Sequence, residues 1–197
     1  MAVYSVDPLP DNCYPGTTVL VNKLDIQDQA DLDAVESTLV SAKAALWEVS
    51  PPVSSFDFAH YCAIHRFLFE DLYDWAGTPR TINIAKKGTS FCPASQIKAV
   101  ADAVFLHLSE ENYLQGLDKT SFTAALVDFY ERTNELHPFR EGNGRTQRLF
   151  LSQLADHAGY RLDFARVDPD DLMIATIQAA NGVNIFLKEL FGEMIFI

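Results

Sequence analysis

The chain has 197 residues, 48% of them hydrophobic, which suffices for one well-buried core and favours a single domain. Its formal net charge of −12, with no Lys/Arg-rich block, argues against nucleic acid as the main partner. No apolar run approaches the roughly 20 residues that span a bilayer, and no signal peptide opens the sequence, so we expect a cytoplasmic protein without membrane contact.

Residues 1–23 are expected to form an irregular N-terminal arm, because Pro8, Pro10 and Pro15 interrupt regular structure. The domain itself is expected to cover residues 24–197. Three cysteines at wide spacings make neither a zinc motif nor a disulfide framework, so we expect free thiols.

Helical periodicity dominates the rest of the chain, because apolar residues recur at steps of three and four. The pattern predicts helices that include residues 32–46, 58–68, 97–108, 122–133 and 149–154. In the first of them the predicted apolar stripe consists of Leu32, Val35, Leu39, Ala42 and Leu46. A further helix is expected after Asp168, a suitable N-cap followed by Pro169 at the first helical position, and a last one in VNIFLKELF, after Gly182.

Only residues 80–93, RTINIAKKGTSFCP, break the helical pattern. Ile82 and Ile84 alternate with Thr81, Asn83 and Ala85 before KKG and a short return strand, which predicts a β-hairpin on an otherwise all-α domain. A lone hairpin leaves an unpaired edge. Such an edge can bind an extended peptide as an added strand.

The stretch ELHPFREGNGRTQRLF concentrates reactive residue types before a helix. Pro138 disfavours helical dihedral angles at His137, so the preceding helix should end there and leave His137 at a loop. With an ordinary pKa of about 6.5, an imidazole at such a place can take a proton from a hydroxyl near neutral pH. Taken alone, a histidine before proline is more often a cap or a core residue.

The residues after His137 predict a polyphosphate site. Two glycines directly before a helix allow main-chain N–H groups to face an anion, and the helix N-terminus favours phosphate. Arg145 and Arg148 lie one helical turn apart and can face the same anion, although two arginines on a helix commonly form a solvated face. Glu141 would repel phosphate unless a divalent cation lay between them, which predicts a Mg²⁺ ion there.

The stretch HPFREGNGRTQR resembles the signature of the Fic-domain family, HxFx(D/E)GNGRxxR, with every specified position present. The similarity extends to HRFLFEDLYDWAGTPR, to the hairpin and to QAAN, and so covers most of residues 20–191. It implies an all-α Fic fold with a β-hairpin flap over the active site. It also implies a protein adenylyltransferase that transfers AMP from ATP to a Ser, Thr or Tyr hydroxyl of a target protein and releases pyrophosphate.

The resemblance also implies roles for the motif residues. His137 would be the general base that deprotonates the target hydroxyl, and Phe139 would anchor the loop in the core. Glu141 would hold Mg²⁺ between the α- and β-phosphates.

The remaining motif residues would bind the nucleotide. Gly142, Asn143 and Gly144 would form the anion hole, and Arg145 and Arg148 would hold the β- and γ-phosphates. In the related Doc branch a lysine stands at the position of Gly144 and the γ-phosphate is transferred. The glycine here therefore favours AMP transfer over kinase activity.

Three further assignments follow from looser parts of the resemblance. Lys87 and Gly88 of the flap would close over nucleotide and target, and Asn181 would meet the adenosine part. Met173 and Ile174 are candidates for a wall of the adenine pocket, although core packing is the expected role of each.

Many relatives carry an inhibitory helix, (S/T)xxxE(G/N), whose glutamate pairs with the second motif arginine, and neither flank of the motif contains a match. We therefore expect a bacterial toxin restrained by a separate small antitoxin, with the target bound through the flap edge. The alternatives are another nucleotidyl or phosphocholine transferase, a de-AMPylase, or a non-catalytic Fic-like binding module. Export as an effector also stays open.

Overall fold

The computed structural model describes residues 4–5, 12–49, 55–86 and 89–197. The helices within these residues are α1 (Gln29–Val49), α2 (Phe58–Phe69), α3 (Ile97–Glu110), α4 (Lys119–Leu136), α5 (Asn143–His157), α6 (Pro169–Ala180) and α7 (Ile185–Met194). Short 3-10 segments lie at Ala94–Gln96, Asn112–Leu114 and Phe164–Arg166. The prediction of a mainly helical fold is confirmed, and each predicted helix is present.

Side-chain caps explain where several of these helices begin. Asp57, Asp118 and Asp168 precede α2, α4 and α6, and each carboxylate accepts a hydrogen bond from a main-chain N–H of the first helical turn. Pro169 follows Asp168 at the first position of α6, as the sequence predicts.

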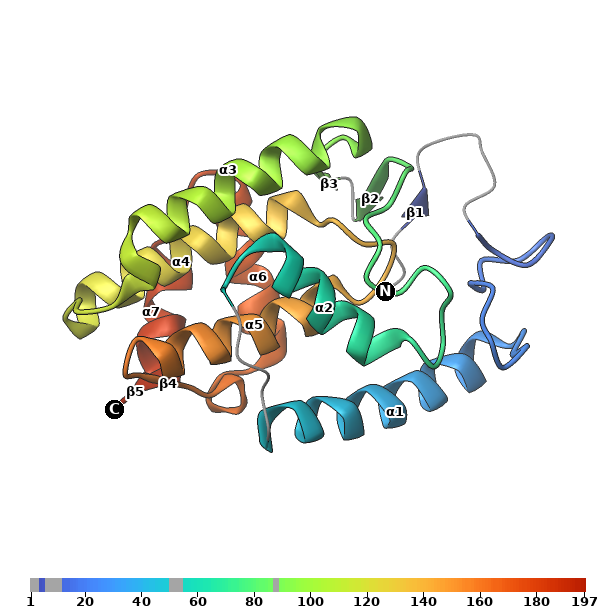
Figure 1. Ribbon diagram of the computed structural model, residues 1–197, viewed down its shortest axis with the longest axis horizontal. Coiled ribbons are helices and arrows are strands. Elements are labelled where there is room, and N and C mark those ends of the chain that lie inside the picture. Colours follow the sequence, from blue (N-terminus) through green and yellow to red (C-terminus); the bar gives the residue numbers. More distant parts are fainter. Residues whose placement is uncertain (1–3, 6–11, 50–54, 87–88) are drawn as a thin grey trace.

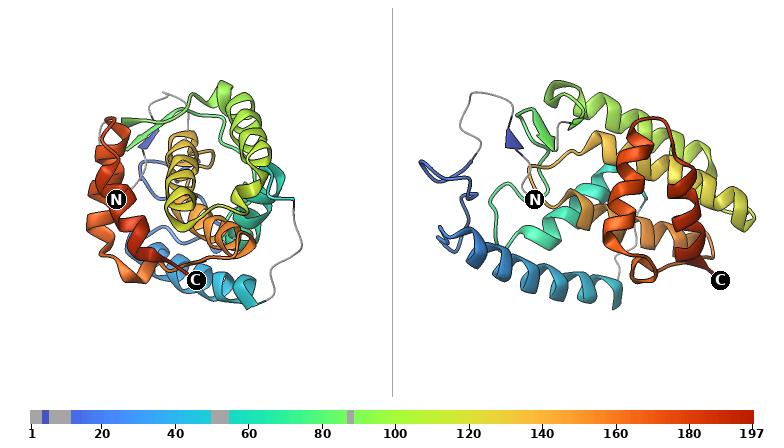
Figure 2. Two further views of the ribbon diagram at one scale, coloured as in Figure 1. Left: turned by 90° about the vertical axis from the view of Figure 1, so that its left-hand side faces the viewer. Right: turned by 180° about the vertical axis from the view of Figure 1, so that it is seen from behind.

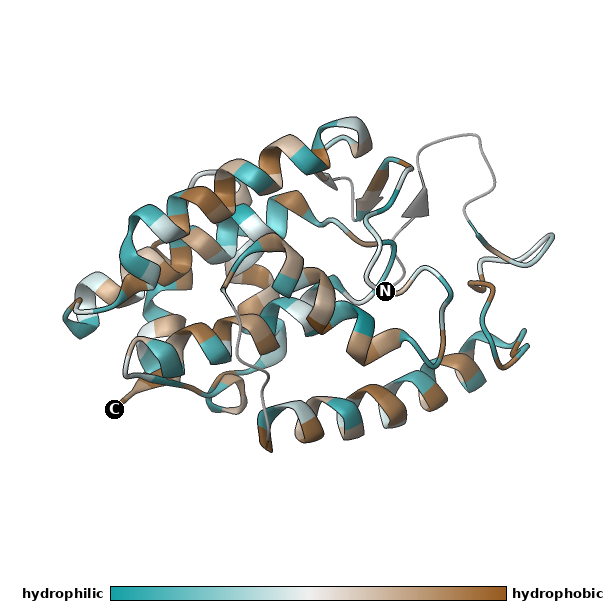
Figure 3. Cartoon of the chain, in the orientation of Figure 1, coloured by the Kyte–Doolittle hydropathy of each residue, from teal (hydrophilic) through white to brown (hydrophobic). Residues whose placement is uncertain are grey.

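Helix α5 lies at the centre of the molecule, where it packs against α2 and α4 (Figure 1). Its residues Phe150, Leu151 and Leu154 are fully buried. Hydrophobic and hydrophilic residues alternate along the surrounding helices (Figure 3). Helices α6 and α7 form a pair on one side, which Figure 2 shows from behind, and α1 runs along another side against α2. The motif residues at the start of α5 are thus supported by the core.

The buried face of α1 differs from the predicted stripe. Its buried residues are Leu32, Glu36, Val40 and Trp47. Ala42 and Leu46, which the prediction placed inside, are exposed. The buried face is therefore rotated relative to the predicted one, and its residues follow one another at intervals of four and seven positions. One of them, Glu36, carries a carboxylate.

The predicted hairpin is present as β2 (Ile84–Lys86) and β3 (Thr89–Ser90), but it is not a lone hairpin. Strand β1 (Tyr4–Ser5) pairs antiparallel with β2, so β2 is the middle strand of a three-stranded sheet. The N-terminal arm is accordingly not wholly irregular. It also pairs Cys13 with Leu20, a buried residue of the core.

A second small sheet, β4 (Arg161–Leu162) with β5 (Ile195–Phe196), was not predicted.

No disulfide forms among Cys13, Cys62 and Cys92, as expected. In the described part of the chain, no helix combines the length and the apolar character that crossing a membrane requires.

Candidate active site

His137 follows the last residue of α4 and adopts a left-handed backbone conformation, with φ of 39°. The helix ends there, as Pro138 predicts, but the main chain turns sharply instead of becoming extended. Nδ1 of the ring lies 3.2 Å from the carbonyl oxygen of Asn134. Because a carbonyl can only accept, Nδ1 carries the proton and Nε2 has a free lone pair, as a general base requires.

Phe91, directly after β3, covers the ring of His137. The two rings stack with centroids 3.7 Å apart and an interplanar angle of 11°. Burial, together with the positive charges of Lys86 and Arg80, lowers the pKa of His137 to about 3. The imidazole is therefore neutral at physiological pH, with the lone pair of Nε2 unprotonated.

Side-chain hydrogen bonds fix the loop between α4 and α5. The amide of Asn143 bonds both main-chain groups of Phe139, accepting from its N–H and donating to its carbonyl oxygen at 2.8 Å each. These two bonds hold the Asn143 side chain against the loop, so its main-chain N–H is the group that faces the open start of α5. Phe139 is fully buried between the rings of Tyr61 and His65, as an anchor of the loop should be.

His65 holds the next part of the same loop. Its Nδ1 accepts a hydrogen bond from the N–H of Gly77 at 2.8 Å, and its Nε2 donates to the carbonyl oxygen of Glu141 at 3.0 Å. Sequence periodicity assigned His65 only to a helical face, and no local pattern shows that it reaches Glu141. The contact joins residues 76 positions apart.

Arg80 connects the flap to the loop that carries His137, and sequence reasoning missed this role. Its guanidinium donates to the carbonyl oxygens of His137, Ile82 and Cys92. Its main-chain N–H bonds the carbonyl oxygen of Pro138 at 2.8 Å. A buried arginine with several carbonyl acceptors fixes the base of the flap beside the histidine.

Gly142 is required where α5 begins. Its φ is 80°, and a Cβ there would lie 2.3 Å from the Phe69 ring, so neither the backbone nor the space tolerates a side chain. No side chain caps α5, and the first N–H groups of a helix have no partner inside it. The N–H groups of Asn143, Gly144 and Arg145 are thus suited to an anion.

Glu141, Arg145 and Arg148 surround this helix start. One oxygen of Glu141 accepts from the N–H of Gly142 at 2.8 Å and lies 3.4 Å from Nη2 of Arg145. Its other oxygen has no hydrogen-bond partner in the described residues. Mg²⁺ commonly binds one protein carboxylate and takes its further ligands from phosphate and water, so this oxygen suits it. Arg148 forms no ion pair with any described residue, so its charge is available to a ligand.

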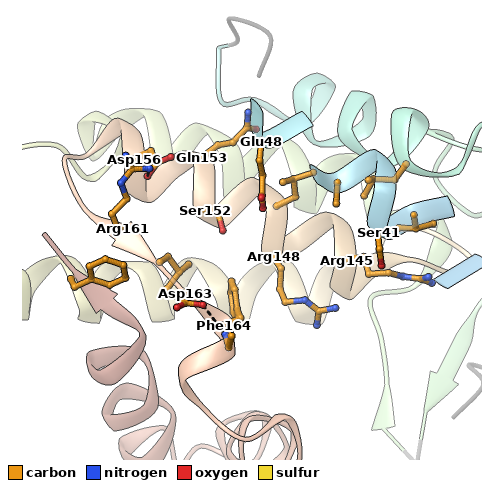
Figure 4. A pocket seen from close by; sticks show the side chains of 17 residues that line it. Ser41, Glu48, Arg145, Arg148, Ser152, Gln153, Asp156, Arg161, Asp163 and Phe164 are labelled. Carbon is orange, nitrogen blue, oxygen red and sulfur yellow. Dashed lines mark hydrogen bonds and ion pairs between the residues drawn. The ribbon is translucent and has the colours of Figure 1, made fainter. Parts of the chain in front are cut away.

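A cavity of about 640 Å³ opens beside the two arginines. Helix α1 borders it with Ser41 and Glu48, α5 lies along another wall, and the segment after β4 contributes Phe164. In Figure 4, Arg145 extends toward α1, while the guanidinium of Arg148 reaches into the open part of the cavity. The two motif arginines thus line a recess that runs along α5, and its wall also contains the carboxylates of Glu48, Asp156 and Asp163.

The looser predictions fare differently from the motif. Lys87 and Gly88 lie outside the described residues. Asn181 is exposed at the end of α6, and its side chain donates to the carbonyl oxygen of Ile177. Core packing is wrong for Met173 and Ile174, which are 38% and 46% exposed, because α6 buries Ala175 and Ala179 instead.

Stability should fall as the pH drops from about 6.5, because two histidines are neutral in the folded protein. Burial lowers the pKa of His65, like that of His137, to about 3. In the unfolded chain each imidazole takes up a proton near pH 6.5, so protons favour unfolding below that pH. Urea unfolding at pH 7.5, 6.5 and 5.5 should show this decline. In His65→Gln the slope of unfolding free energy against pH should be smaller by up to about 1.4 kcal/mol per pH unit. An unchanged slope would contradict a neutral His65.

Comparison with known proteins identifies relatives over most of the chain. Residues 55–155 match the Fic/DOC family. The chain is 40% identical over 177 residues to the probable protein adenylyltransferase y4lH of Sinorhizobium fredii, covering 89% of each chain. It is 36% identical over 182 residues to the probable protein adenylyltransferase Fic of Escherichia coli, covering 92% of this chain and 90% of that protein. Among solved structures, BepC of Bartonella tribocorum, a VirB-translocated effector with bound AMPPNP, has a TM-score of 0.88 at 30% identity, covering 94% of this chain and 96% of that chain.

Proposed function

This chain belongs to the Fic/DOC family, and we propose that it transfers AMP from ATP to a Ser, Thr or Tyr hydroxyl of a target protein, with release of pyrophosphate. As a Fic-family protein adenylyltransferase it is an enzyme. The observation that carries the proposed step is the free Nε2 of a neutral His137 beside an uncapped helix start. The AMPPNP bound to BepC supports a nucleoside triphosphate as the ligand of this fold.

In the proposed reaction, Nε2 of His137 takes the proton of the target hydroxyl as its oxygen attacks the α-phosphorus. A bond forms between that oxygen and phosphorus, and the bond from the α-phosphorus to the oxygen bridging to the β-phosphate breaks. The electron pair leaves with pyrophosphate. The bond from Nδ1 of His137 to Asn134 holds the ring in the required tautomer and stabilises the imidazolium that forms.

The start of α5 would bind the phosphates of the nucleotide. Gly142 allows the sharp turn before α5, and the N–H groups of Asn143 and Gly144 would complete the anion hole around the phosphates. Arg145 and Arg148 would hold the β- and γ-phosphates. Glu141 would hold Mg²⁺, which when bound would neutralise charge on the phosphates. Gly144 lacks the side chain that reverses the nucleotide in the Doc branch. Lys87 and Gly88 are proposed to close over the nucleotide and the target, and Asn181 is proposed to contact the adenosine part.

The test is incubation of the purified chain with ATP labelled at the α-phosphorus and a cell lysate. We expect a labelled protein band in the wild type and none with His137→Ala. Mass spectrometry of that band separates AMP transfer from other nucleotidyl or phosphocholine transfer. Loss of AMP from a pre-modified protein would instead favour de-AMPylation, and nucleotide binding with no labelled product would favour a non-catalytic module.

A separate small inhibitor is proposed to restrain the enzyme, as an antitoxin restrains a toxin. Arg148 has no carboxylate partner among the described residues, in contrast to Arg145. The 640 Å³ cavity between α1 and α5 leads to its guanidinium. A helix that presents a glutamate there would pair with Arg148 and displace the γ-phosphate.

Expression of the chain alone tests the need for such an inhibitor. Wild-type expression should arrest growth, His137→Ala should not, and co-expression of a small protein encoded beside it should restore growth. Harmless wild-type expression with little AMP transfer in vitro would contradict an external inhibitor. High activity that the neighbouring protein neither binds nor inhibits would favour an exported effector, and the name of BepC as a translocated effector gives that alternative some support.

The target is proposed to bind the outer edge of β2 as an extended segment. The carbonyl oxygen of Ile84 accepts from the N–H of Phe91 on the β3 side. In an antiparallel strand, the N–H and C=O of one residue point to the same edge, and those of the next residue point to the opposite edge. The N–H and C=O of Ala85 therefore point away from β3. Strand β1 pairs with that edge, and a target segment must displace it.

Deleting residues 1–11 should therefore increase kcat/KM for the target protein. Releasing one or two hydrogen bonds of β1 corresponds to about tenfold. Ala85→Pro removes the edge donor and should slow target modification while ATP binding stays unchanged, whereas Ile84→Pro should break the hairpin itself. Binding of ATP and transfer to the target are measured for each variant. A deletion that slows transfer would make β1 part of the docking surface and contradict the proposal.

A further inference from the structure

A buried carboxylate from a distant helix contacts the first motif arginine. Glu36 lies on the inner face of α1 and is only 8% exposed. Its Oε1 lies 2.5 Å from Nη2 of Arg145, and its Oε2 accepts the hydroxyl hydrogen bond of Tyr73. Both carboxylate oxygens are therefore occupied. Glutamate is seldom this buried unless it is paired, so the fold holds Glu36 against Arg145.

The hydroxyl of Tyr73 is fixed in the role of donor. Burial, and then the nearby charge of Glu36, raise the pKa of Tyr73, so it remains protonated. The ring of Tyr73 stacks on Trp75 with centroids 4.4 Å apart. Glu36 is thus held in place from the side opposite Arg145.

Arg145 has two further neighbours. Its guanidinium lies over the ring of Phe69 at 4.8 Å, and Nη2 lies 3.4 Å from Oε1 of Glu141. Charge-assisted hydrogen bonds have lengths of about 2.7–2.9 Å, so the bond from Arg145 to Glu36 is the tight one and its 3.4 Å ion pair with Glu141 is long and weak. Without Glu36, the nearest carboxylate for this charge would be Glu141.

We propose that Glu36, supported by Tyr73, is a positioning residue for nucleotide binding. It holds Arg145 by one nitrogen, which leaves other guanidinium donors to face phosphate, and it prevents a tight pair between Arg145 and Glu141. Glu141 then keeps its charge available to Mg²⁺. The inference rests on the proposed function, in which Glu141 holds the metal and Arg145 the phosphates.

The test compares Glu36→Gln with wild type. Glutamine retains the size and an acceptor for Tyr73 but loses the charge that holds Arg145. We expect the KM for ATP to rise about tenfold with kcat within about threefold, and the Mg²⁺ midpoint to shift to higher concentration. Binding of a non-hydrolysable ATP analogue, measured by calorimetry at several Mg²⁺ concentrations, should weaken in parallel. Glu36→Asp, which keeps the charge, should restore part of the affinity.

Two further variants separate positioning from a structural role. Tyr73→Phe keeps the ring but removes the donor to Glu36, so it should shift the same parameters in the same direction by less. Asp33→Asn changes an exposed carboxylate of the same helix and should match wild type. Thermal unfolding is measured for every variant.

Unchanged analogue affinity and Mg²⁺ midpoint in Glu36→Gln, with lower thermal stability alone, would overturn the inference. Tighter nucleotide binding in that variant would overturn it too, because Glu36 would then compete with phosphate for Arg145. The calorimetric result does not depend on AMP transfer. A wild type that binds nucleotide and transfers nothing would therefore count against the proposed function and leave this test intact.

Discussion

Replacing His137 by alanine should lower the rate of AMP transfer by about 10²–10⁴-fold while ATP binding stays close to wild type. The reason is the direction of the imidazole: Nδ1 is bonded to Asn134, and the free Nε2 is the atom that would take the proton of the target hydroxyl. The base acts on the target, so its loss should appear in transfer and not in affinity for the nucleotide.

Transfer is measured with α-labelled ATP, and binding by calorimetry. His107→Ala is a matched control, because His107 lies on α3 and its side chain pairs with Glu111 of the next turn. This control should transfer AMP at the wild-type rate. A rate within about tenfold of wild type for His137→Ala would mean that another group is the base.

Glu141→Ala should remove most of the dependence of transfer on Mg²⁺. Glu141 offers one unpaired carboxylate oxygen beside the uncapped start of α5. Across the part of the chain that the structure describes, no group of three or more His, Cys, Asp or Glu side chains offers the metal another place. With this carboxylate gone, the metal keeps only phosphate and water as ligands, so its effect on rate should weaken.

A Mg²⁺ titration of the transfer rate checks this expectation. Arg148→Ala serves as the contrast, because it should weaken ATP binding at every Mg²⁺ concentration and leave the shape of the titration unchanged. A Glu141→Ala titration that superimposes on wild type would place the metal elsewhere.

The helices could be predicted because their signals are local. Steps of three and four apolar residues locate them, and Asp168 with Pro169 marks the beginning of α6. The face that α1 buries could not be predicted in the same way. Leu32 belongs to the predicted apolar stripe and to the observed buried face alike. Packing against α2 selects the face that contains Glu36 and leaves Leu46 in solvent.

The motif predicted which residues gather at the start of α5, because a spacing of a few residues fixes their mutual distance. The residues that hold the motif in place come from elsewhere in the chain: Arg80 and Phe91 from the flap and His65 from α2. Each acts through a contact with a residue more than 40 positions away, for which a single sequence gives no signal. The pairing of β1 with β2 was missed for the same reason.

The central claim is that the α-phosphorus of ATP becomes attached to protein. The most direct measurement incubates the purified chain and its target with ATP labelled at the α-phosphorus in one sample and at the γ-phosphorus in another. The account predicts that α-label enters the protein while γ-label is released in pyrophosphate, and that His137→Ala shows neither. Protein labelled from the γ-position would contradict it, because the nucleotide would then bind in the reverse direction and the enzyme would be a kinase.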